Sequence, residues 1–450
     1  MKVKRNHQSL RVDVAPDGQG LISNSGTMLL AEVADRAGLT GALSRELAGV
    51  RERTSKHDPG RVVRDLAVML AAGGEAVTDL GGLRGQECLF GKVASDSTAW
   101  RLVEKLSFDP EFLGAVQDAR LAARQQVWNI SGRPDRVTID LDGTLVNSHS
   151  EKEGAAGDFK GGFGFHPMMA FIDETSEAAA AVLRPGNAGA NTADDQILTA
   201  SLALAQIPGQ GTKDGPEVLL RTDTAGAVHD LLKWARKNRI GFSVGFDLTE
   251  MVRDAIGQVP EKAWRKAVNQ DGEFRKNGQV TEITSLLDLK NWPEGSRVIV
   301  RRERPHPGAQ LTFTDHDGHR FQAILTDRPG KDIATIEREH RARARAENQI
   351  SDMKDTGLAN LPFKSFEMNQ IWLEIVMVAH DLLAWTKTLL LEGELKIARP
   401  KRLRHRLLNI AGRLAYHART ARLHLQKSWP WAADLAAAFQ KLRQLPQPAG

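Results

Sequence analysis

The sequence predicts an α/β protein with a mixed sheet, helices on both of its faces, a β-rich insertion, and helical regions at the two ends of the chain. Up to about residue 130, apolar residues recur at intervals of three and four positions, which is typical of amphipathic helices. From Arg136 onward, short apolar runs bounded by turn residues alternate with helical segments, which favours a sheet covered by helices. A chain of 450 residues exceeds the size of one ordinary domain, so we expect about two to four structural units.

Residues 1–130 are expected to form a helical DNA-binding region. The apolar periodicity predicts helices over 28–37, 61–72, 97–106 and 110–128. The third of these follows the N-cap candidates Ser95 and Asp96, and its outward positions include Arg101 and Lys105. A helix of this kind could enter a major groove of DNA. The same pattern is equally consistent with a plain helical bundle that does not bind DNA.

The remaining chain divides into four further segments. Residues 131–254 are expected to form the first part of the sheet-bearing core, 255–330 the β-rich insertion, 331–395 the returning core helices, and 396–450 a basic helical C-terminal region. The expected strands are 137–146, 167–172, 180–183, 217–222, 241–246, 297–302, 310–314 and 321–326, and the expected helices are 193–205, 225–237 and a long polar helix from 332 to about 356.

The number of cysteines and the hydropathy of the sequence indicate in which cellular compartment the protein is found. The single cysteine, Cys88, cannot form an internal disulfide, which suits a reducing compartment and excludes Cys-rich zinc modules. No apolar run reaches the ~18 residues that a membrane-spanning helix requires. The sequence therefore predicts a soluble, cytoplasmic protein with no membrane partner.

Positive charge is concentrated near the C-terminus. The net charge is only +5, but between Leu395 and Ala433 there are ten Lys or Arg residues and no Asp or Glu. Because a solvated helix face usually carries both signs, this basic stripe predicts contact with a phosphate backbone. Arg402, Arg404 and Arg406 are the candidate DNA-binding residues within it.

Two carboxylates share one face of the first predicted strand, because Asp140 and Asp142 are two positions apart. The string around them resembles the first motif of haloacid-dehalogenase-type phosphatases, in which the first Asp is the nucleophile and the second an acid/base. That family also needs a later Gly-Asp pair, which we do not find, and it places the motif nearer the N-terminus. The phosphatase is retained as an alternative.

A second motif lies on the long polar helix. His340, Arg343, Glu347 and Lys354 follow the spacing of the Tyr-x2-Arg-x3-Glu-x6-Lys signature, with His in place of Tyr. The chain thus resembles the DDE-type transposases of bacterial insertion sequences, which have an RNase H-like catalytic core. Asp142 in Asp-x-Thr and Asp223 in Arg-Thr-Asp match the other two acids of this family, and residues 183–187 match the turn after its third strand.

The resemblance implies metal-dependent cleavage of DNA ends followed by strand transfer. Two Mg²⁺ ions about 3.5 to 4 Å apart, with Mn²⁺ as a substitute, are expected to be held by Asp142, Asp223 and Glu347. Asp140 competes with Asp142 for the first position. His340, Arg343 and Lys354 are the expected DNA contacts of the signature, with the His340 contact in doubt because the family has Tyr there.

The implied partner is double-stranded DNA, both at the terminal inverted repeats and at the target site. The family usually acts as a homodimer in its DNA complex, and such a protein is nucleoid-associated when bound. A domesticated DNA-binding protein that has lost cleavage is the remaining alternative, and the intact acids argue against it.

Overall fold

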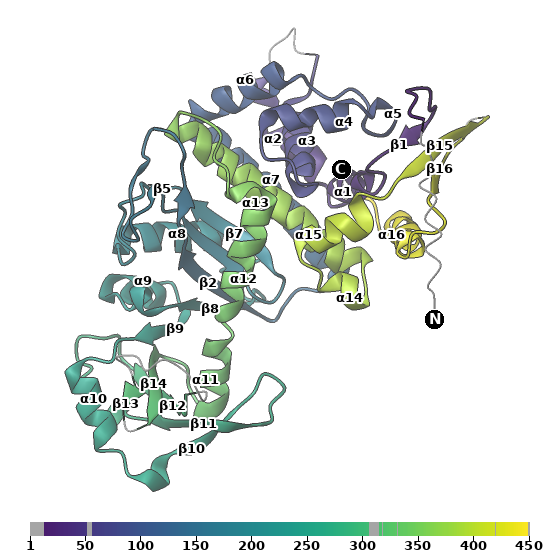
Figure 1. Cartoon of the computed structure of the whole chain (residues 1–450). Helices are drawn as coiled ribbons and strands as arrows, with labels where there is room; N and C mark the ends of the chain where they lie inside the picture. The colour runs from purple at the N-terminus through teal and green to yellow at the C-terminus, as the bar shows by residue number, and fades with distance from the viewer. Residues whose placement is uncertain are drawn as a thin grey trace, which may run out of the picture.

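The computed structural model describes residues 13–51, 56–305, 315–316, 318–330, 332–418 and 420–448. Figure 1 shows a central sheet with helices packed on its upper part, a β-rich region at the opposite end, and a small separate sheet beside the C-terminal helix. The expected strand 310–314 and Arg419 of the basic stripe lie outside the described residues.

The central sheet is mixed, as the sequence predicts. Its strands lie in the order β10-β11-β12-β14-β9-β8-β2-β6-β7, with β13 beside β14. The middle of the sheet consists of β2 (Arg136–Gly143), β6 (Met168–Ile172), β7 (Glu177–Val182), β8 (Glu217–Thr222) and β9 (Gly241–Phe246). β2 is parallel to β8, and β8 to β9, whereas β6 is antiparallel to both β2 and β7.

The β-rich segment extends this same sheet. It contains β10 (Arg265–Val268), β11 (Phe274–Glu282), β12 (Arg297–Glu303), β13 (Asp315–His316) and β14 (His319–Thr326). β14 pairs with β9 over four residue pairs, from Ala323 opposite Phe246 to Thr326 opposite Ser243. The apolar side chains of β9, β12 and β14 form a second core with α10 (Glu250–Gly257), while α11 (Ile333–Arg341) packs on β10 and β11.

The N-terminal helices share one hydrophobic core with the middle of the sheet. They are α1 (Thr27–Arg36), α2 (Leu39–Glu46), α3 (Pro59–Ala71), α4 (Gly81–Arg84), α5 (Glu87–Phe90), α6 (Asp96–Ser107) and α7 (Pro110–Ser131). α13 (Phe366–Leu390) packs against α3, α6, α7 and β7 and thereby joins the two parts. No helix within the described ranges, α13 included, is both long enough and apolar enough to cross a membrane.

The expected long helix after Asp332 is interrupted, so that prediction is wrong. α11 ends at Arg341 and α12 (Ala344–Met353) begins after a tight turn. Within the turn, the amides of Arg343 and Arg345 each donate to the carbonyl three positions earlier, where an uninterrupted α-helix would use the fourth. After α12, a wide π-turn (Lys354–Leu358) contains Gly357 at φ +106°, with the nearest side-chain atom of Leu70 only 2.7 Å from where a Cβ would lie.

The C-terminal region is only partly helical, which corrects the expectation for residues 396–450. It contains α14 (Gly393–Lys396), α15 (Pro400–Leu403), a π-turn (Arg404–Leu408), the hairpin β15 (Gly412–His417) and β16 (Thr420–Leu425), and α16 (Ala432–Gln444). β1 (Leu21–Ile22) pairs with β15 to complete a three-stranded sheet. The hairpin forms because apolar and polar residues alternate with a period of two, which suits a strand and not a helix.

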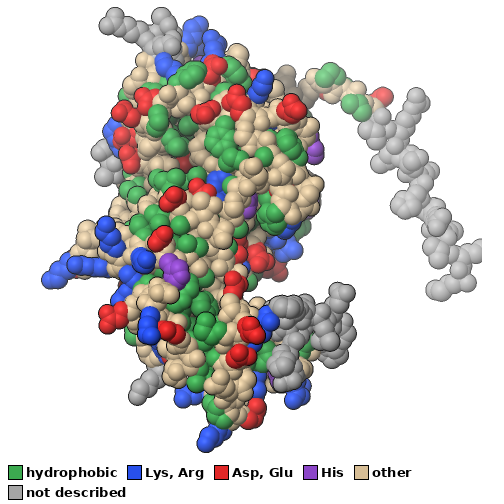
Figure 2. All heavy atoms as spheres, turned by 90° about the vertical axis from the view of Figure 1, so that its left-hand side faces the viewer, with side chains coloured by type: hydrophobic (Ala, Val, Ile, Leu, Met, Phe, Trp, Pro, Cys, Tyr) green, Lys and Arg blue, Asp and Glu red, His purple; other side chains and the backbone are tan. Residues whose placement is uncertain are grey.

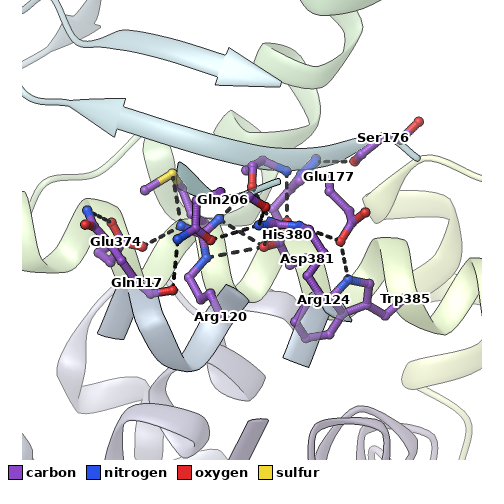
Figure 3. A network of polar contacts seen from close by, with 12 residues as sticks. Gln117, Arg120, Arg124, Ser176, Glu177, Gln206, Glu374, His380, Asp381 and Trp385 are labelled. Atoms are coloured by element: carbon purple, nitrogen blue, oxygen red, sulfur yellow. Dashed lines mark hydrogen bonds and ion pairs between the residues drawn. The ribbon is translucent and has the colours of Figure 1, made fainter. Parts of the chain in front are cut away.

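A buried polar network connects α7, α13 and β7 (Figure 3). Arg120 and Arg124 of α7 have fully buried side chains, and both donate to Asp381 of α13 at 3.0 Å. Arg120 also donates to Glu374 at 2.5 Å, and Arg124 to Glu177 of β7 at 2.9 Å. The second oxygen of Asp381 accepts from the backbone amide of Ala178. The network therefore bonds two helices distant in sequence to the edge strand of the core.

We expect Asp381→Ala to destabilise the fold by about 3 to 5 kcal/mol, because it leaves two buried guanidinium groups without their shared partner. Asp118→Ala is the matched control, since Asp118 lies exposed on the same helix as the two arginines. Urea denaturation followed by far-UV circular dichroism measures both variants. Equal midpoints for the two variants would contradict the assigned role of the network.

Candidate active site

The structure brings the three predicted acids to one edge of the sheet. Asp142 is the penultimate residue of β2, and Asp223 directly follows the last residue of β8. Because β2 and β8 are adjacent and parallel, their carboxyl ends, and with them the two acids, lie at the same edge of the sheet. Asp142 and Asp223 line one cavity of about 130 Å³. Asp223 and Glu347, which lies in the first turn of α12, line a second cavity of about 810 Å³. Asp223 thus borders both cavities.

Arg343 connects two of these acids. Its Nη1 donates to Oδ2 of Asp142 at 3.2 Å, and its Nη2 lies 4.0 Å from Oε1 of Glu347. The side chain of Asp142 is 16% exposed, whereas that of Glu347 is 71% exposed. The tight turn between α11 and α12 gives Arg343 its position at the start of α12, from which it reaches the sheet edge.

The electrostatics of the edge favour a cation. Burial raises the pKa of Asp142 to about 6; the Arg343 guanidinium opposes this shift, and the charges of Asp223 and Glu347 add to it. The acids are therefore close enough to repel one another. Carboxylate oxygens are the ligands that hard divalent cations prefer, so the donor chemistry of Asp142 and Asp223 fits such an ion.

The acids do not form a ready-made metal centre. Across the part of the chain that the structure describes, no group of three or more His, Cys, Asp or Glu side chains is arranged to hold a metal ion. The side chain of Glu347 is largely exposed to solvent, and its nearest ion-pair partner among the described residues is Arg343, at 4.0 Å. To act as a third ligand, its side chain has to turn toward Asp142 and Asp223.

Asp140 has a different environment from Asp142. Its side chain is 2% exposed, and its two oxygens accept from Nε and Nη2 of Arg221, both at 2.6 Å. Arg221 also pairs with Asp173 at 3.0 Å. Asp140 is therefore occupied by a buried bidentate ion pair between β2 and β8, away from the open end of the strand.

The signature residues separate into two groups. His340, Arg343 and Glu347 line the 810 Å³ cavity together. Burial and the nearby charges of Arg221 and Arg343 lower the pKa of His340 to about 3, so the ring is neutral at pH 7, and its Nδ1 lies 3.0 Å from Oγ of Ser243. Lys354 instead donates to the carbonyl of Leu145, at 2.9 Å, beyond the end of β2.

The three basic-stripe candidates line neither cavity. Arg404 donates to the carbonyls of Ala71 and Asp355, and is half-buried. Arg406 pairs with Glu394 at 2.9 Å and lies over the ring of Trp431, with its guanidinium carbon 4.7 Å from the ring centroid. Arg402 is exposed. Two of the three arginines are thus engaged in contacts within the protein.

A group of arginines that was not predicted from the sequence surrounds the larger cavity. Besides Arg343, its lining includes Arg253 of α10, Arg301 of β12, Arg320 of β14 and Arg341 of α11. Figure 2 shows basic, acidic and histidine side chains lying together on the face between the upper body and the β-rich end. The sequence gives one sign of this group, the arginine-rich segment 301–304. Its position beside the acids depends on the pairing of β14 with β9, which no local sequence pattern reveals.

Comparisons with known proteins identify the family. No curated protein matches the chain. Among solved structures, the cryo-EM structure of a piggyBac transposase synaptic complex with hairpin DNA is similar with a TM-score of 0.42 and 9% sequence identity, covering 85% of this chain and 79% of that chain. The family model described as transposase DDE domain group 1 matches residues 4–447. Because this match spans nearly the whole sequence, the chain belongs to the DDE transposase family and is a DNA transposase.

Proposed function

We propose that this transposase cuts the ends of an insertion sequence and joins them to target DNA, using Asp142, Asp223 and Glu347 as its metal-binding acids. One observation carries the assignment: two acids lie at the carboxyl ends of adjacent parallel strands, and Arg343 connects the first of them to Glu347. We assign the five strands β7-β6-β2-β8-β9 to an RNase H-like core, to which β10 to β14 are an addition.

The proposed cofactor is a pair of Mg²⁺ ions, for which Mn²⁺ can substitute. When bound, such ions activate the attacking oxygen and stabilise the leaving 3′ oxygen of an in-line displacement. Asp142 and Asp223 would hold them at the sheet edge, and Glu347 would join when its side chain turns inward. Arg343 would then leave the carboxylates and bind a phosphate, for which its planar, two-pronged donor geometry is suited.

The larger cavity is the proposed path of the DNA end. Its lining includes Arg253, Arg301 and Arg320 from the β-rich side, together with Asp223 and Glu347. Arg301 is already paired with Glu303 and Glu337, so it would have to leave these carboxylates to bind a phosphate. Arginines on the β-rich side can hold the phosphates of a strand whose scissile bond lies at the acids. Under this proposal the β-rich segment is one wall of the substrate cleft. Lys354 and His340 would position the ends of α12 and α11, in addition to any DNA contact.

Asp142 is the proposed first acid, with Asp140 as a structural residue. Both oxygens of Asp140 are occupied by Arg221, whereas Asp142 shares a cavity with Asp223. The phosphatase alternative, which would use Asp140 as nucleophile, is not favoured because the family match is to transposases. The other alternative, a domesticated DNA-binding protein without cleavage, is likewise not favoured, because the transposase family model matches nearly the whole chain.

The proposed partners are the terminal inverted repeats and the target duplex, bound by a homodimer that is nucleoid-associated. The N-terminal helical region, residues 1–130, and the C-terminal region, residues 396–450, are the proposed sites of end recognition. Residues 131–254 and 331–395 form the proposed catalytic core around the 255–330 segment.

We expect Asp223→Ala and Glu347→Ala to abolish DNA nicking while leaving the affinity for element ends within about twofold, because each removes a metal ligand and not the fold. Glu250→Ala is the control, since Glu250 is an exposed acid on α10. Nicking of supercoiled DNA in Mg²⁺ or Mn²⁺ and a gel-shift assay measure the two properties. Activity of either site variant at the level of the control would refute the assignment.

Asn substitutions distinguish Asp142 from Asp140. Because folding raises the pKa of Asp142 from 3.8 to about 6, its ionised form opposes folding above that pH. In EDTA at pH 8, Asp142→Asn should therefore raise the free energy of unfolding, by at most about 3 kcal/mol, and this gain should disappear as the pH falls through 6 toward 4. Burial also raises the pKa of Asp140 to about 6, although the Arg221 guanidinium opposes that shift. Asp140→Asn should nevertheless lower stability, because it leaves the buried guanidinium of Arg221 without its bidentate partner.

The Asp142→Asn and Asp140→Asn variants are also assayed for nicking of supercoiled DNA. Asp142→Asn should be inactive although it is stably folded, and Asp140→Asn should retain activity in proportion to its folded fraction. The opposite result, an inactive but folded Asp140→Asn beside an active Asp142→Asn, would reverse the assignment.

A further inference from the structure

The hairpin formed by β15 and β16, residues 412–425, is called the C-terminal ribbon here. In Figure 1 it projects from the body beside α16. β1 pairs only with its base, where Leu21 lies opposite Arg413 and Ile22 opposite Gly412, and the carbonyl of Gly20 accepts from the amide of Leu414. From Ala415 to the turn at Ala418, β15 has β16 as its only partner strand among the described residues.

The register gives the ribbon two different faces. Residues directly opposite each other in an antiparallel pair project from the same face. One face carries the pairs Arg413–His424, Ala415–Arg422 and His417–Thr420, and the other carries Gly412–Leu425, Leu414–Leu423 and Tyr416–Ala421. Every residue of the first face except Ala415 is exposed, whereas Leu414 on the second is buried. The first face is therefore polar, basic and open to solvent.

Among the residues that the structure describes, no acid neutralises the charge on this face. Elsewhere in the basic stripe, Arg399 pairs with Asp352, Lys401 with Asp355, and Arg406 with Glu394. Arg413 and Arg422 make no such ion pair with any residue that the structure describes. The sequence from Leu395 to Ala433 contains no acid that could pair with them locally. The ribbon thus presents free positive charge, which the body-bound arginines do not.

The base of the ribbon is anchored. The amide of Gln426 donates to the carbonyl of Ala411, which closes the hairpin, and the indole of Trp429 donates to the carbonyl of Arg406 at 2.8 Å. Arg406 in turn lies over Trp431. Because its base is held in this way, the ribbon keeps a fixed direction relative to the rest of the protein. Binding of a ligand to its basic face would therefore lose little conformational entropy.

We propose that the C-terminal ribbon is a DNA-binding arm whose basic face lies along a groove of duplex DNA. The inference rests on the proposed function and adds to it the element and the manner of binding. Six residues of strand span roughly 20 Å, and a major groove about 12 Å wide admits a two-stranded ribbon. Arg413 and Arg422 contact phosphates at the groove edges, and Arg404 and Arg406 serve the fold instead.

The first test compares two pairs of substitutions in the full-length protein. Arg413→Gln with Arg422→Gln should weaken binding of a 40-base-pair duplex about tenfold near 0.1 M salt, and should make the slope of log affinity against log salt shallower by about 1.8, since two phosphate contacts are lost. Lys213→Gln with Lys237→Gln is the control of equal charge, because both lysines are exposed and lie outside the ribbon. Fluorescence anisotropy gives the slopes.

The second test locates the ribbon directly. Cys88 is the single cysteine and is exposed, so the chain is first made Cys88→Ser. A cleavage reagent attached at Thr420→Cys should then cut both strands of bound DNA at nearby positions, whereas the same reagent at Lys213→Cys should not.

The outcomes separate the two proposals. A wild-type protein that binds no duplex would remove the proposed function as well. If wild type binds and nicks DNA, but the ribbon variant matches its control in slope and the reagent at position 420 leaves DNA intact, the ribbon is not a DNA arm. A ribbon variant that changes only the oligomeric state by light scattering would likewise overturn the proposal, because the ribbon would then contact a second copy of the chain.

Discussion

The buried ion network between α7 and α13 is the interaction on which the rest of the structure depends. Two guanidinium groups and three carboxylates, with almost no exposure to solvent, are expensive to bury unless each is hydrogen-bonded. Asp381 meets this condition by accepting from Arg120, Arg124 and the amide of Ala178. Because these groups are satisfied only in one arrangement, the network fixes how the N-terminal helices lie against the edge of the sheet.

This constraint extends to the candidate site through α13. The helix that carries Asp381 and Glu374 follows α12, which carries Glu347, after only the π-turn and a short connection. Gly357 in that turn lies against Leu70 of α3, so the N-terminal helices also contact the chain directly after α12. The position of Glu347 relative to the sheet edge therefore depends on packing far from the acids. The N-terminal region and the sheet share a single hydrophobic core, through which this dependence can act.

Sequence patterns predicted the local elements of the core well and the long-range pairing poorly. The bounds of α8 (Ala193–Ala205), β8 and β9 agree with the expected segments, because each is a short periodic run with clear turn residues at both ends. The convergence of Asp142 and Asp223 follows from parallel strands. The break before Arg343 was not predictable, since no Gly or Pro marks it. That Arg253, Arg301 and Arg320 line one cavity was not predictable from local patterns, because it depends on β14 joining β9. The basic stripe predicts DNA contacts for Arg404 and Arg406, whereas tertiary contacts within the protein occupy both.

The pairing of β14 with β9 also determines the mechanics of the cleft. A wall attached through a loop can swing open, but this wall continues the hydrogen-bonded sheet that carries Asp223 on its other side. Moving it away from the acids would break backbone hydrogen bonds along four residue pairs and expose the apolar core beneath β9, β12 and β14. The β-rich wall therefore keeps its position relative to Asp223. If the DNA end follows the proposed path, the deformation that brings it to the acids therefore falls on the DNA and not on this wall.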